Sequence, residues 1–242
     1  MHTGVKEKMI RIGYTQGDIN ARMKPSNILR EAQQIALEHC DELGFSGKVM
    51  QEQNRMFVLA KLQVDVERMP LQGEQVRVRT CAYQPKRLVY QRVTTFESPE
   101  GEKLVTVDSR WTMLDTKTWR ITRETLPELM EKMLPVQDFD DIRIPMKEYP
   151  DELPEAVVRY TMLDINQHVN NAVYADWAQD ALEQELMAGK QVRRMQLLYH
   201  REAKLGTVVR IHHAFADGVH YLRGEHDGGH CFDASVTLTE AE

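Results

Sequence analysis

The stretch Leu163-Asp-Ile-Asn-Gln-His-Val-Asn-Asn-Ala-Val-Tyr-Ala-Asp-Trp177 decides the fold, because it leads a polar loop into a predicted apolar helix. Its Asp164-Ile165-Asn166 repeats an earlier run, Asp18-Ile19-Asn20, which also precedes a predicted helix. Three matching residues can arise by chance. The order of elements around the two runs also matches, so we predict an internal repeat.

The first run leads into residues 25–43, whose apolar side chains recur at helical spacing between Pro25 and Gly44. Alternating apolar and polar residues then predict four strands, most clearly at 56–66. A short strand is predicted before the helix, at 9–15. The four strands after it are predicted at 56–66, 74–82, 88–96 and 103–114.

The same order returns in the second half. A helix is predicted at 172–187, capped by Asn170 or Asn171, with strands at 155–162, 195–203, 207–215, 219–227 and 230–238. Prolines and acidic residues mark the connection, which includes a short predicted helix at 125–133. We predict an α+β fold of two units, 1–117 and 154–242, joined by a linker at 118–153. Pairing the units covers sheet edges and makes an internal pseudo-dimer.

Composition limits the class of protein. The 242 residues are 42% hydrophobic and 28% charged, as in ordinary globular proteins, and no run is apolar enough to span a bilayer. The net charge of −6 argues against nucleic-acid binding. The three cysteines lie far apart, so we expect no disulfides. The histidines lack the spacing of metal ligands, so we expect no metal site, and we expect no cofactor. We expect a cytoplasmic protein with no membrane partner.

The repeat locates the candidate active site. Aligning the two runs puts Arg22 opposite His168, and aligning Gly73 with Gly206 puts Met69 opposite Glu202, so the second copy alone carries these acid–base groups. Three side chains in the loop alternate in sequence and can face one pocket beside a helix N-terminus. They are Asp164, Asn166 and His168.

A structural reading of the same residues stays open. Asp, Asn and His before a helix serve more often as turn and capping residues than as catalysts. Glu202 alone would pair on the surface with Arg201 or Lys204.

The Asp-Ile-Asn-Gln-His-Val-Asn-Asn run resembles the signature of acyl-acyl carrier protein (acyl-ACP) thioesterases of plant plastids and their bacterial relatives. Four other segments resemble the same family over nearly the whole chain: Val64–Val78, Trp111–Asp115, Arg120–Leu126 and Tyr199–Ala203. The resemblance implies a tandem double hotdog fold, in which each long helix is wrapped by an antiparallel sheet. It also implies hydrolysis of fatty acyl-ACP by Asp164, Asn166, His168 and Glu202, with the acyl chain held in the first unit.

One position departs from the family. Plant members have a cysteine directly after the glutamate, whereas this chain has Ala203, so we expect hydrolysis by water without a cysteine nucleophile. The plant transit peptide is also missing, which favours a bacterial-type cytosolic enzyme. Because acyl carrier protein is acidic, docking needs a local basic patch. Candidates are Arg193, Arg194, Arg201, Lys204 and Arg210.

Other functions remain open on the sequence. An acyl-CoA thioesterase or a hotdog dehydratase would use similar acid–base residues. An acyl-binding sensor without catalytic activity would use the same fold, and we expect it to carry a DNA-binding segment, which is not visible. The sequence leaves acyl-chain preference open and does not decide whether two chains form a homodimer.

Overall fold

The computed structural model describes residues 4–241, which divide into two compact units. The first contains the N-terminal segment through Lys24 with residues 28–62 and 67–141. The second contains residues 25–27, 63–66 and 142–241. Within residues 4–241, no helix is long and apolar enough to cross a membrane.

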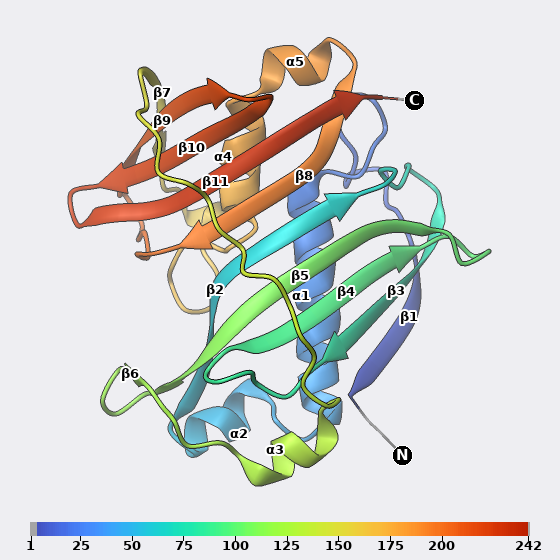
Figure 1. Ribbon diagram of the computed structural model, residues 1–242, viewed down its shortest axis with the longest axis vertical. Helices are drawn as coiled ribbons and strands as arrows, with labels where there is room; N and C mark the ends of the chain where they lie inside the picture. The colour runs from blue at the N-terminus through green and yellow to red at the C-terminus, as the bar shows by residue number, and fades with distance from the viewer. Residues whose placement is uncertain (1–3, 242) are drawn as a thin grey trace. The chain divides into compact units, whose positions relative to one another are not determined.

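The first unit is a sheet with one long helix, α1 (Pro25–Glu42) (Figure 1). Its strands follow the order β1-β3-β4-β5-β2, with a short β6 beside β5. Antiparallel pairing joins β1 to β3, β3 to β4, and β4 to β5. The strands are β1 (Val5–Arg11), β2 (Arg55–Val66), β3 (Gln75–Ala82), β4 (Tyr90–Glu97), β5 (Lys103–Asp115) and β6 (Arg120–Ile121). Two short helices complete the unit, α2 (Gly47–Glu52) and α3 (Pro127–Lys132).

The second unit repeats this topology in the strand order β7-β9-β10-β11-β8. Its strands are β7 (Asp151–Val157), β8 (Lys190–Tyr199), β9 (Val208–Ala216), β10 (Val219–His226) and β11 (Gly229–Glu240). Its helices are the 3-10 turn η1 (Tyr160–Met162), α4 (Val173–Asp180) and α5 (Glu183–Met187). Tyr174 and Trp177 of α4 pack against Phe232 of β11, with ring centroids 5.1 and 6.0 Å away. The α+β prediction and the repeat are therefore confirmed.

The two Asp-Ile-Asn loops have the same backbone. The side chain of Asp18 accepts the Asn20 N–H at 2.8 Å, and Asp164 accepts the Asn166 N–H at 2.8 Å. Each loop then turns through a residue with positive φ, 60° at Ala21 and 65° at Gln167. Because the hydrogen bonds coincide position by position, the loops are equivalent in structure as well as in sequence.

The segments that face these loops also correspond. Met23 N–H donates to Pro70 O at 2.8 Å, and Val169 N–H donates to Ala203 O at 3.0 Å. Gly73 and Gly206 close both hairpins with φ near 80°, a conformation that favours glycine. The predicted alignment of Met69 with Glu202 is therefore confirmed.

Several element boundaries differ from the predictions, among them the strand predicted at 9–15, which is found as β1 at Val5–Arg11. The helix predicted at 172–187 breaks into α4 and α5, because Leu182 leaves the helical region at φ −118° while its side chain is buried. The strand predicted at 155–162 ends at Val157 and is followed by η1.

The strand predicted at 195–203 begins at Lys190 and ends at Tyr199. His200 and Arg201 both donate their N–H groups to Cys231 O, at 2.9 and 3.2 Å. The chain leaves the regular ladder there, which puts Glu202 in a loop and not in the middle of a strand.

Candidate active site

Asp164 shapes the loop that enters α4. Its Oδ1 accepts the Asn166 N–H, and its Oδ2 accepts the Asn166 Nδ2 at 3.4 Å. Asp18 makes the same turn in the first unit, so the turn-forming role predicted as an alternative applies to this aspartate. The further bond to the side-chain amide fixes the direction of Asn166, which is exposed to solvent.

His168 and Glu202 meet although 34 positions separate them. His168 Nε2 lies 2.9 Å from Glu202 Oε2. The two side chains are 26% and 60% exposed, so a solvent molecule or a substrate can reach them. Their equivalents in the first unit, Arg22 and Met69, cannot form such an acid–base pair.

The same contact excludes one alternative. Glu202 pairs with His168, while the side chains of its neighbours Arg201 and Lys204 form no ion pair with any residue of the described chain 4–241. The expected surface pairing of Glu202 with either neighbour is wrong.

Backbone donors surround the start of α4. The N-cap of α4 is Ala172 and not the predicted Asn170 or Asn171, although Asn170 Oδ1 accepts the Ala172 N–H at 2.9 Å and the Asn170 carbonyl accepts the Val173 N–H at 2.9 Å. The N–H of Asn171 has no hydrogen-bond partner among residues 4–241. A free N–H beside a helix N-terminus can bind an oxygen that develops negative charge.

The second unit, described through residue 241, has no exposed thiol. Ala203 is buried at the position after Glu202, and its carbonyl accepts the Val169 N–H. The nearby Cys231 is also buried, and burial raises the pKa of its thiol despite a contact with the Tyr174 hydroxyl. A protonated, buried thiol is a poor nucleophile.

The first unit contains a narrow cleft with a cavity volume of about 20 Å³. Its walls come from α1, β2, β4 and β5 of the first unit, where the family resemblance places the acyl chain. Apolar side chains form most of the lining: Leu29, Ala32, Ala36, Leu59, Leu62, Val107 and Trp111.

The five basic candidates for docking have different environments. Arg193 and Arg194 hydrogen-bond to Val66 O and to the Asp65 carboxylate, and Arg210 lies 3.4 Å from Asp227. Arg201 and Lys204 are exposed on either side of Glu202.

A repeated helix-on-sheet unit, with an acid–base pair in its second copy alone, defines a class of asymmetric double hotdog proteins. Family models give the particular family. Residues 4–133 match the acyl-ACP thioesterase N-terminal domain, and residues 148–237 match the acyl-ACP thioesterase C-terminal domain. The chain therefore belongs to the acyl-ACP thioesterase family.

Known relatives agree with this assignment. The chain is 29% identical over 199 residues to a chloroplastic acyl-[acyl-carrier-protein] hydrolase of Cuphea viscosissima, covering 75% of this chain and 48% of the relative. It is 25% identical over 225 residues to the oleoyl-acyl carrier protein thioesterase 2 of Arabidopsis thaliana, covering 84% and 61%. The chain thus spans about half the length of the curated relatives it matches.

Solved structures show the same fold. An acyl-ACP thioesterase from Bacteroides thetaiotaomicron aligns with a TM-score of 0.88 at 20% identity, covering 98% of both chains. The 12:0-ACP thioesterase from Umbellularia californica aligns with a TM-score of 0.84 at 19% identity, covering 99% of both. These matches confirm the double hotdog fold.

Proposed function

We propose that this protein hydrolyses fatty acyl-ACP to a free fatty acid and holo-ACP, and so ends fatty-acid synthesis. The observation that carries the proposal is the 2.9 Å contact between His168 and Glu202, in the segment that matches the family's C-terminal domain. The chloroplastic relatives named as acyl-ACP hydrolases support the same reaction.

Water is the nucleophile in this proposal. Glu202, assisted by His168, accepts a proton as the water oxygen attacks the thioester carbonyl carbon. Asn166, oriented by Asp164, positions the water or the substrate. The Asn171 N–H binds the carbonyl oxygen as it becomes negative. The tetrahedral intermediate then collapses, the carbon–sulfur bond breaks, and the phosphopantetheine thiolate takes up a proton.

The two units divide the work. The walls of the cleft in the first unit move apart to admit the acyl chain, because the lining is mostly apolar and burial of each CH₂ group contributes about 0.8 kcal/mol. The second unit supplies all four proposed catalytic residues: Asp164, Asn166, His168 and Glu202. This division gives the first copy a function although it lacks the acid–base pair.

Acyl carrier protein docks through the basic side chains that flank Glu202. Arg201 and Lys204 carry charges that no carboxylate within residues 4–241 neutralises, so they are available to an acidic partner. Added salt should then lower the activity on acyl-ACP steeply and leave the activity on a small thioester nearly unchanged. Equal salt responses for the two substrates would contradict this docking mode.

The deciding experiment compares acyl-ACP, acyl-CoA and 3-hydroxyacyl-ACP as substrates of one preparation. Release of free acid with a much higher kcat/KM on acyl-ACP supports the proposal. Preferred cleavage of acyl-CoA, dehydration of the hydroxyacyl substrate, or binding without turnover would each replace it with one of the other functions. The free fatty acids produced by cells that express the protein would give the acyl-chain preference.

The cysteine-free mechanism has its own test. A folded variant without Cys40, Cys81 and Cys231 should keep its turnover; loss of turnover would overturn the mechanism. The three thiols are free in the structure, which is consistent with the reducing cytoplasm where we place the reaction.

A further inference from the structure

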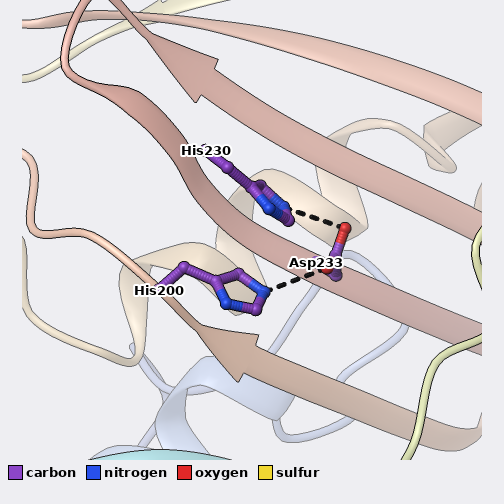
Figure 2. A group of neighbouring side chains, drawn as sticks. All are labelled: His200, His230 and Asp233. Carbon is purple, nitrogen blue, oxygen red and sulfur yellow. Dashed lines mark hydrogen bonds and ion pairs between the residues drawn. The ribbon is translucent and has the colours of Figure 1, made fainter.

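Three potential metal ligands converge in the second unit, outside the proposed catalytic group (Figure 2). His200 follows the end of β8, whereas His230 and Asp233 belong to β11. His200 Nε2 lies 3.0 Å from Asp233 Oδ2, and His230 Nε2 lies 3.1 Å from Asp233 Oδ1. The three ligand atoms all lie within 4.8 Å of one another.

His230 is the least satisfied member of this cluster. Its Nε2 is buried and has no hydrogen-bond partner among residues 4–241, because the close approach to Asp233 lacks hydrogen-bond geometry. A buried polar atom without a hydrogen bond is unfavourable, because it has given up its bonds to water. An ion held between the imidazole and the carboxylate would satisfy this nitrogen.

We propose that His200, His230 and Asp233 bind a divalent transition metal ion of the zinc class. Two imidazole nitrogens and one carboxylate oxygen suit such ions, whereas Mg²⁺ and Ca²⁺ prefer oxygen ligands alone. Metal–ligand bonds of about 2.0–2.1 Å in a tetrahedron place neighbouring ligands roughly 3.3 Å apart. The two imidazole nitrogens approach different oxygens of Asp233, and the three ligand atoms lie up to 4.8 Å apart, so the side chains must draw together by up to about 1.5 Å to bind one ion.

The surroundings of the cluster prepare it for an ion. Arg223 Nε donates to Asp233 Oδ1 at 3.1 Å and so holds the carboxylate in place, as outer-shell groups do at metal sites. The guanidinium also repels a cation, so we expect weaker binding than at a structural zinc site.

Solvent can reach the cluster from the side of His200. This side chain is 36% exposed, which allows an ion to enter and leaves room for water as a fourth ligand. The metal would link the segment after β8 more firmly to β11, where the His200 N–H already donates to Cys231 O. Sequence alone predicts no metal site, because residues 200 and 233 share no ligand spacing.

The test uses the full chain, freed of any affinity tag and treated with chelator. Calorimetric titration with Zn²⁺ at neutral pH should give one bound ion per chain, and Co²⁺ should give the absorption of a site with nitrogen ligands. His200→Gln should weaken Zn²⁺ binding by about 10-fold or more. The matched control is His212→Gln, which changes a histidine of β9 outside the cluster and should leave binding unchanged.

Two results would overturn the proposal. One is the absence of stoichiometric Zn²⁺ binding by the folded wild-type chain. The other is equal Zn²⁺ affinity in the wild type and His200→Gln, which would place the ion elsewhere. Asp233→Asn provides a second ligand variant, but His200→Gln decides the question if the buried substitution fails to fold. None of these readouts depends on thioesterase activity.

Discussion

Replacing Glu202 by glutamine keeps the size of the side chain and removes its charge. The structural cost should be small, because the carboxylate is 60% exposed and touches His168 at 2.9 Å. Coulomb's law gives about 1.4 kcal/mol for unit charges at this distance in water. Side-chain entropy and salt reduce the net value for an exposed pair to roughly 0.2–1 kcal/mol.

The catalytic cost should be much larger. Loss of a positioned general base lowers rates by about 10²- to 10⁴-fold. Each factor of ten is about 1.36 kcal/mol, so the barrier should rise by roughly 2.7–5.4 kcal/mol. In Glu202→Gln, the increase in the activation free energy should therefore be several times larger than the decrease in the free energy of unfolding. A purely structural role of the carboxylate cannot produce this difference.

The assay measures kcat/KM on the preferred acyl-ACP and the free energy of unfolding in urea for the same preparations. Asp227→Asn is the matched control, because Asp227 is fully exposed in the second unit and pairs with Arg210 at 3.4 Å. The control should keep its activity. A double variant that also carries His168→Ala should be little worse than either single variant, since paired groups act as a unit. Activity of Glu202→Gln within about threefold of the wild type would refute the assignment of the base.

Three further predictions test packing, the acyl cleft and acid stability. Gly224→Ala should destabilise the protein in urea by about 1–3 kcal/mol or more, because the added Cβ would lie 2.1 Å from the ring of the buried Phe232; unchanged stability would contradict this close contact between β10 and β11. Ala36→Leu should shift the released fatty acids to shorter chains, since the larger side chain fills part of the cleft; an unchanged product profile would place the acyl chain elsewhere. Burial would raise the pKa of Glu74, but hydrogen bonds from Arg68 and a backbone N–H lower it overall. The ionised carboxylate therefore stabilises the folded protein above the ordinary pKa of 4.5. This stabilisation is lost as the pH falls through the lowered pKa. Glu74→Gln should consequently show a flatter loss of stability in acid than the wild type, and parallel urea midpoints across this range would refute the linkage.

Local sequence patterns were enough to predict most of the fold. Pro25 and the apolar spacing after it predicted α1, and strict alternation predicted β2, because helix and strand periods depend on near neighbours. The Asp18 and Asp164 runs predicted two equivalent loops, and the structure gives both the same hydrogen bonds. The alignment also placed Glu202 and Met69 at equivalent positions before any contact was known.

Tertiary structure decided the features that depend on distant partners. Helix propensity favours continuity through 172–187, but the backbone leaves the helical conformation at the buried Leu182. The ladder between β8 and β11 ends beside Tyr199 and Phe232, and this register brings His200 to Asp233. Sequence by itself thus determined the repeated units and the candidate catalytic copy, whereas the pairing of particular side chains followed from strand register. Register joins residues more than thirty positions apart, and no local pattern of spacing contains that information.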